Sequence, residues 1–168
     1  MILLLDERQR KELAQYSPYI AMLKVSSQNR RYIPMDYLEG EIIPGDKLFT
    51  MPSATSYEFG KLMSNVHMAW TRAVCGRLKS DYSYSNTIVY NNFPWPSPTK
   101  AILNARALYP DSNLADLYDP LTMPTELLKA HNANNRAVMD AYGFSIKMSE
   151  ADCVAELMRM YQKLTKEK

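Results

Sequence analysis

The feature that most constrains this chain is an apolar stripe in residues 55–76, because any other element has to pack against it. Apolar residues recur there at spacings of three and four, which places them on one face of a helix. Thr55 followed by Glu58 fits a capping box, and Gly76 fits a C-terminal cap. The stripe consists of Phe59, Leu62, Met63, Val66, Trp70, Ala73 and Val74. We therefore expect one long helix with a core-facing side.

Short β-prone runs lie on both sides of this helix. Residues 20–27, 30–35 and 41–51 precede it, and residues 81–93 follow it. The polar sequence 26–29 separates the first two runs and predicts a turn. We expect these runs to form a small mixed β-sheet packed on the helix.

Three alternating prolines, Pro94, Pro96 and Pro98, divide the chain. They exclude a helix and favour an extended linker. Phe93 and Trp95 lie among them, and we expect both rings to anchor this hinge to the long helix.

Helix-forming residues dominate after residue 99. Two short helices are expected within residues 100–118, and a third opens at Thr122 and Pro124 and runs to Gly143. A fourth opens at Ser149 with Asp152.

The predicted fold class is α+β, a small mixed sheet on one long helix followed by an all-α unit. The expected divisions are an N-terminal helical segment (1–20), an α+β domain (21–98) and a helical domain (99–168).

Composition excludes several classes of protein. The 168 residues carry a net charge of +2, so any basic surface must be local. No apolar run approaches the ~20 residues of a membrane span, and we expect a cytoplasmic protein. The two cysteines and two histidines show no metal-site spacing, and no metal is expected.

Catalytic motifs are also missing. The five glycines form neither a dinucleotide-binding nor a phosphate-binding loop, and no nucleophile elbow is present. The stretch SNTIVYNNFPWP (85–96) resembles the Asn-Pro-Pro-aromatic loop of amino-methylating enzymes, but Asn92 is followed by Phe93 rather than proline. We therefore expect a last strand and a hinge there, not a catalytic loop.

Basic, amide and aromatic side chains gather after the polar turn and after the long helix. Arg and Lys bind phosphates or guanine, Asn and Gln pair with adenine, and Tyr donates to phosphate. The first candidates for DNA contacts are Arg30, Arg31, Arg77 and Lys79, and the second are Gln28, Asn29, Tyr82, Tyr84 and Asn86. A solvated surface without a ligand is the alternative interpretation.

Long stretches of the chain resemble a known family. LKVSSQNRRYIP (23–34) and residues 46–96 and 105–144 look like the C-terminal part of MmeI-like enzymes. These are type II restriction–modification proteins that combine adenine-N6 DNA methylation, sequence recognition and usually cleavage in one chain. The resemblance implies a target recognition domain whose β-rich face enters the major groove, then a helical domain that supports it or lies along the duplex.

The same resemblance implies partners and a cofactor. The partners are double-stranded DNA and a methyltransferase domain or subunit, and S-adenosylmethionine is expected only in that methyltransferase part. The family's methyl-donor and Asn-Pro-Pro-Tyr motifs have no counterpart here, so we expect no enzyme in this chain alone. The segment before residue 21 and the linker after Pro98 are short for the family, which indicates a fragment without the catalytic domain.

A protein-interaction or scaffold module that docks on a methyltransferase or partner subunit is the alternative function. An exposed apolar patch on residues 124–164 would favour it.

Overall fold

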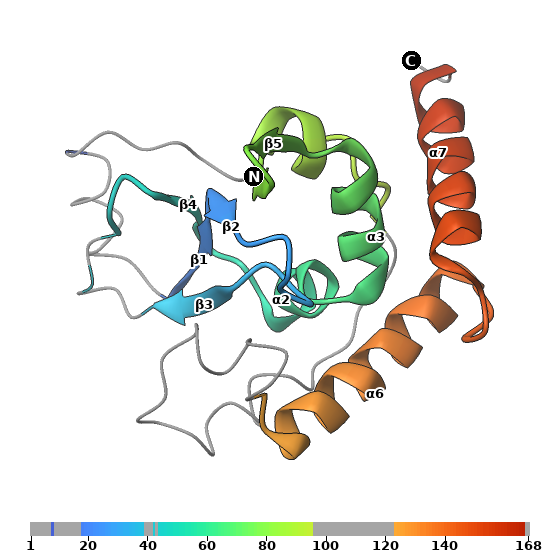
Figure 1. Cartoon of the computed structure of the whole chain (residues 1–168), viewed down its shortest axis with the longest axis horizontal. Coiled ribbons are helices and arrows are strands. Elements are labelled where there is room, and N and C mark those ends of the chain that lie inside the picture. Colours follow the sequence, from blue (N-terminus) through green and yellow to red (C-terminus); the bar gives the residue numbers. More distant parts are fainter. Residues whose placement is uncertain (1–7, 9–17, 39–41, 43, 96–122, 167–168) are drawn as a thin grey trace.

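The computed structural model describes residues 8, 18–38, 42, 44–95 and 123–166 (Figure 1). Apart from Arg8, the predicted N-terminal helix lies outside these residues, as do the two short helices expected within 100–118. The strands lie on one side of helices α2 and α3, while α6 and α7 lie on the other (Figure 1). The chain therefore has the predicted α+β class.

The first sheet is built around β1 (Tyr19–Leu23), which lies between β3 (Met35–Leu38) and β4 (Leu48–Met51). Both pairings are antiparallel, with Ile20 opposite Tyr37 on one side and Met51 on the other. Ile20, Met22, Met35 and Met51 belong to the main core.

The second sheet has the order β2–β6–β5, from Val25–Ser26, Asp81–Ser83 and Gly76–Leu78. We call it sheet B. Lys24 separates β1 from β2, because its N–H bonds to the Lys47 carbonyl at 3.1 Å while its own carbonyl accepts from the N–H of Tyr84 at 2.8 Å. The expected single mixed sheet is therefore wrong: the described strands form two antiparallel sheets.

The expected long helix is divided into α2 (Ser56–Leu62) and α3 (Asn65–Val74). The capping box of Thr55 and Glu58 is confirmed at the start of α2. A new helix starts because the Ser64 hydroxyl accepts from the N–H of His67 at 3.2 Å. The predicted Gly76 cap is wrong, since Cys75 is already extended (φ −71°, ψ 138°) and leads directly into β5.

The apolar stripe nevertheless faces the core across the break. Its most deeply buried members, at most 2% exposed, are Phe59, Leu62, Met63, Val66 and Trp70. Val74 packs at the edge of the core, and Ala73 is exposed.

The predicted last strand is a π-helical turn, η1 (Asn86–Tyr90). Polar side chains satisfy its backbone locally: Ser85 Oγ accepts from the N–H of Ile88 at 3.2 Å, and Asn92 Nδ2 donates to the Ile88 carbonyl at 3.0 Å. Such bonds compete with a strand ladder. The indole of Trp70 also donates to the Val89 carbonyl at 2.9 Å, which fixes the turn on α3.

The two C-terminal helices match their predicted signals. Helix α6 (Thr125–Tyr142) ends at Gly143, whose φ of 70° lies in the left-handed region that glycine favours. Helix α7 (Glu150–Lys166) follows Ser149, whose hydroxyl accepts from the N–H of Asp152 at 3.2 Å.

Helix α6 packs on the break between α2 and α3 through buried polar side chains. Asn134 Nδ2 donates to the Gly60 carbonyl at 2.6 Å, and Asn135 Oδ1 accepts from the N–H of Asn65 at 2.8 Å. His131 Nδ1 lies 3.3 Å from the Met63 carbonyl. These backbone groups lose their helical partners at the break, so α6 supplies the missing ones.

Helix α7 packs along α3 and completes the core. The rings of Trp70 and Tyr161 are 6.1 Å apart, and Arg72 bridges to Glu150 through two bonds of 2.6 and 2.8 Å. Leu127, Val138, Met139, Cys153 and Leu157 share one apolar cluster with the residues of α2 and α3. The described parts of both predicted domains therefore fold around one core.

The hinge anchors are confirmed. Phe93 lies 5.0 Å from the His67 ring and 6.3 Å from the Trp70 ring, and Trp95 packs on Phe93 at 5.3 Å. Tyr142 on α6 donates its hydroxyl to the Pro94 carbonyl. The chain is therefore held at the point where the proline segment begins.

We predict that Asn135→Ala lowers the free energy of unfolding by about 2–3 kcal/mol, because the part-buried N–H of Asn65 loses its acceptor and the buried Tyr32 hydroxyl loses a donor. Urea denaturation followed by circular dichroism measures this change. Asn132→Ala is the matched control, since Asn132 accepts only an exposed bond, from Arg31 at 3.2 Å. Equal losses in the two variants would contradict the role of Asn135.

Candidate nucleic-acid interface

Sheet B brings together two groups of candidate residues that are about fifty positions apart in sequence. Strand β2 pairs with β6 so that Ser26 lies opposite Tyr82, and β6 pairs with β5 so that Tyr82 lies opposite Arg77. The turn after β2 is therefore next to the β5–β6 hairpin. The backbone N–H of Gln28 donates to Asp81 across this junction at 3.4 Å.

The turn after β2 exposes amide side chains. The N–H of Arg30 bonds to the Ser27 carbonyl at 3.2 Å and closes the predicted turn. Gln28 and Asn29 are exposed at its tip, and Arg30 is half-buried. The amide groups are therefore open to a ligand beside the hairpin.

Arg77 is held in place on the hairpin. Its guanidinium lies 4.1 Å from the centre of the Tyr82 ring and donates to the Ser80 carbonyl at 3.2 Å. Tyr82 is only 4% exposed, so it acts as a platform beneath Arg77. Most of the five guanidinium N–H donors stay free for a ligand.

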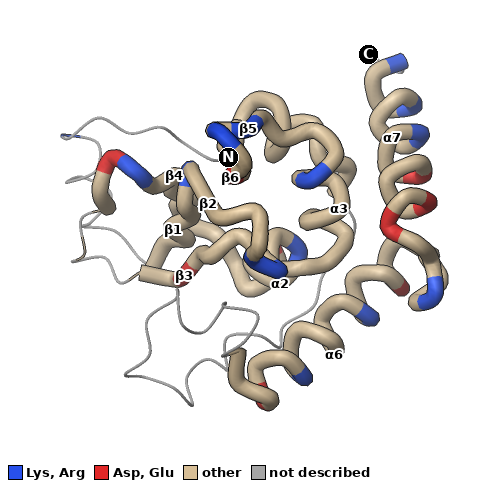
Figure 2. Tube along the Cα trace, in the orientation of Figure 1, with Lys and Arg blue, Asp and Glu red and all other residues tan. Residues whose placement is uncertain are grey.

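Lys79 lies in the turn of the same hairpin and is exposed. Its φ is 56°, a left-handed conformation that is uncommon for a residue with a side chain. Figure 2 shows basic residues at this end of sheet B. The hairpin therefore presents two cations to solvent.

Arg31 is not part of this group. Its guanidinium donates to Asn132 on α6 at 3.2 Å and lies 5.8 Å from the Tyr32 ring. Arg31 is exposed, but it lies against the helical part of the molecule.

Two second-rank candidates have internal partners. Tyr84 is 4% exposed, and its hydroxyl lies 2.9 Å from Nε2 of His67. Asn86 is half-buried in η1, where its side chain accepts from the N–H of Thr87 at 3.0 Å. The Tyr84 hydroxyl is therefore not available to a phosphate in this structure.

The contacts of His67 fix its tautomer. Nδ1 lies 2.9 Å from the Leu62 carbonyl, which can only accept, so Nδ1 carries the hydrogen. Nε2 then accepts from the Tyr84 hydroxyl. Burial lowers the pKa of His67 to about 4, even though the bond to Leu62 acts in the opposite direction.

Two residues of the hairpin, Leu78 and Asp81, were not among the predicted contacts; they lie opposite each other next to its turn. Leu78 is 58% exposed. Lys79–Ser80 between them is not one of the glycine-containing pairs that mark two-residue turns, so the sequence carried no strong hairpin signal here.

Cys75 and His67 do not form a catalytic pair. The Cys75 thiol donates to the Ser83 carbonyl, and burial raises its pKa. His67 is fully buried. Within the described ranges, no cluster of His, Cys, Asp and Glu is arranged to hold a metal ion, and no helix could span a membrane.

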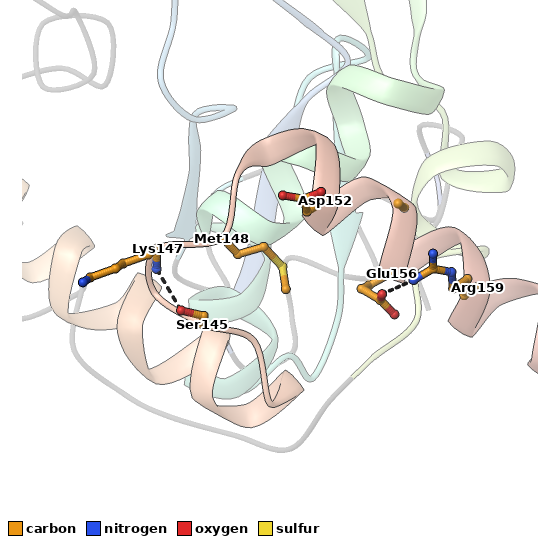
Figure 3. A pocket seen from close by; sticks show the side chains of 7 residues that line it. Ser145, Lys147, Met148, Asp152, Glu156 and Arg159 are labelled. Atoms are coloured by element: carbon orange, nitrogen blue, oxygen red, sulfur yellow. Dashed lines mark hydrogen bonds and ion pairs between the residues drawn. The ribbon is translucent and has the colours of Figure 1, made fainter.

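A groove of about 380 Å³ lies between the α6–α7 loop and the outer face of α7 (Figure 3). Its lining mixes both charges, with Lys147 and Arg159 beside Asp152 and Glu156, and Arg159 is paired with Glu156. None of the candidate DNA contacts lines it.

Comparison with known proteins gives this geometry a context. The family model described as the MmeI target recognition domain matches residues 5–97, and the model described as the MmeI C-terminal domain matches residues 97–167. DNA methyltransferase A of Bacillus subtilis (strain 168) is 38% identical over 94% of this chain, which corresponds to 19% of that protein.

A solved structure is also similar to this chain. It is described as the type IIL restriction-modification enzyme MmeI in complex with DNA. It matches 90% of this chain and 22% of its own, with a TM-score of 0.84 and 41% identity. The chain therefore spans about a fifth of the length of the relatives that it matches.

We predict that stability falls as the pH is lowered from 6.5 to 4. The pKa of His67 is about 4 in the folded chain against an ordinary 6.5, so the unfolded chain binds more protons between these values. The loss attributable to His67 approaches about 3 kcal/mol. Urea denaturation at pH 7, 5.5 and 4 measures it against His67→Gln. That variant is less stable at pH 7 but loses less on acidification; equal losses would refute the assignment.

Proposed function

The chain belongs to the MmeI family, of which it carries the target recognition domain and the C-terminal domain, and from this premise we propose that it is the DNA-recognition module of a restriction–modification adenine-N6 methyltransferase. The observation that carries the proposal is that sheet B joins the turn after β2 to the basic β5–β6 hairpin. We also propose that the boundary between the two domains lies at residue 98 and that the protein is cytoplasmic.

The β5–β6 hairpin is a two-stranded antiparallel ribbon. The major groove of B-DNA admits a two-stranded β-ribbon and presents a different set of donors and acceptors for each base pair. Arg77 and Lys79 would contact phosphates or guanine edges from the hairpin. Gln28 and Asn29 would contact adenine or phosphate from the neighbouring turn.

The remaining candidates have different roles. Tyr82 orients Arg77, whose guanidinium lies 4.1 Å from the centre of the Tyr82 ring. Arg30 would contact the DNA backbone beside the hairpin, and the exposed Arg31 would contact it next to α6. Tyr84 and Asn86 support the core and η1 beneath the interface, through their contacts to His67 and Thr87.

The helical part buttresses the recognition part. Side chains of α6 bond to backbone groups at the break between α2 and α3. An ion pair between Arg72 of α3 and Glu150 of α7 holds these two helices together. Methylation and its S-adenosylmethionine cofactor belong, on this proposal, to a methyltransferase domain outside these 168 residues.

A scaffold function has less support. The apolar faces of α6 and α7 are covered by α2 and α3. In the described part of residues 124–164, the large apolar side chains that are exposed are Ile146 and Leu164, eighteen positions apart. They do not form the patch that a docking surface requires.

We predict that Arg77→Ala and Lys79→Ala weaken duplex binding. Each variant should flatten the dependence of log K on log salt by about one unit if it removes a phosphate contact. Loss of a guanine contact would instead cost about 1–3 kcal/mol at one base pair. Fluorescence anisotropy with a selected duplex, over a range of salt concentrations, measures both effects.

Lys129→Ala is the matched control, because Lys129 is an exposed lysine on α6. It should leave both affinity and salt dependence unchanged. If Arg77→Ala and Lys79→Ala behave like this control, the hairpin is not the DNA-binding face.

A further inference from the structure

Leu78 has no role in the fold that explains its position. It is 58% exposed at the end of β5, and all three residues of that edge strand are exposed. A single exposed leucine is ordinary on a protein surface. This one, however, lies between Arg77 and Lys79, in the hairpin that carries the candidate DNA contacts.

The strand register shows what shares a face with Leu78. Alternate residues of a strand point to the same side, so Leu78 and Gly76 share one face of sheet B, and Asp81, the cross-strand partner of Leu78, lies on that face too. Val25 and Ser83 lie in the same row as Gly76. Arg77 and its platform Tyr82 belong to the opposite face.

The face of sheet B that carries Leu78 is partly apolar and has no side chain at Gly76. Val25 on this face is 39% exposed. Leu78 is therefore the exposed apolar side chain of this face that lies nearest the tip of the hairpin, opposite Asp81.

The charged residues near Leu78 indicate which kind of surface it contacts. An apolar protein surface would have to bury the Lys79 cation next to Leu78 and the Asp81 carboxylate opposite it, which costs free energy. A DNA groove is lined by phosphates that attract the Arg77 and Lys79 cations of the hairpin, and the Asp81 carboxylate already accepts from the N–H of Gln28 at 3.4 Å. Inside the major groove, the C5-methyl group of thymine is the apolar feature that a leucine can contact.

We propose that Leu78 packs against the C5-methyl group of a thymine in the major groove and so contributes to sequence discrimination. The proposal rests on the proposed DNA-recognition function and adds an apolar contact to it. Leu78 distinguishes thymine from cytosine through the methyl group, while Arg77 acts from the other face of the ribbon.

The experiment removes one methyl group from the DNA and the leucine from the protein. Duplexes bound by the full chain are selected from a random library, and each thymine of the selected site is replaced in turn by deoxyuridine. One replacement should weaken binding about fourfold, which corresponds to one methyl group removed from contact. The other replacements should have little effect.

Leu78→Ala is then measured on the same duplexes. The variant should bind the thymine duplex about fourfold or more weakly, and it should no longer distinguish thymine from uracil at the sensitive position. Its melting temperature should equal that of the parent chain, because Leu78 lies outside the core. Val25→Ala is a control on the same face, farther from the tip.

Three results would overturn the proposal: a selected site without thymine, equal discrimination of thymine and uracil by the parent chain and Leu78→Ala, or unchanged affinity in Leu78→Ala. The last would be expected if Leu78 docked on a protein partner instead. Failure of the proposed function is distinct, because no sequence would then be selected and Arg77→Ala would have no effect.

Discussion

The rest of the structure depends on the hydrogen bonds that side chains make to the backbone at the break between α2 and α3. Backbone groups lose their helical partners there, and side chains bond to several of them. Asn134, Asn135 and His131 of α6 serve Gly60, Asn65 and Met63, and His67 serves the Leu62 carbonyl. An unpaired buried backbone group costs free energy comparable to a lost hydrogen bond. The break and the docking of α6 therefore stabilise each other, and the two parts of the chain share one core.

This arrangement positions the candidate interface. Through Ser64, the break sets where α3 begins, and α3 leads without a loop into β5 and the hairpin. His67 connects the break to Tyr84, directly after β6, and α7 holds the other side of α3 through Arg72 and Glu150. The hairpin that carries Arg77, Leu78 and Lys79 is therefore fixed at its base and free at its tip.

The features that could be predicted from the sequence were those encoded by neighbouring residues. The capping box at Thr55, the Ser149 cap of α7 and the glycine after α6 act over a few positions, and the structure confirms them. The break at Ser64 was missed because apolar periodicity continues across it. The turn η1 was missed because its Thr-Ile-Val-Tyr sequence favours a strand. The local bonds of Ser85 and Asn92, the buried position of Val89 and the bond from Trp70 together show why a helical turn forms there.

The sequence by itself determined the α+β class, the two helices after residue 124, the hinge anchors and the residue types of the candidate DNA-binding surface. These follow from local spacing and from side-chain chemistry. Only the tertiary structure decided which candidates lie together, because the pairing of β2 with β6 joins segments far apart in the chain. It also separated exposed from buried candidates: Arg77 rests on Tyr82 and faces solvent, whereas Tyr84 is withdrawn into the core to bond His67. Burial is set by what packs against a residue, and neighbouring sequence does not specify that.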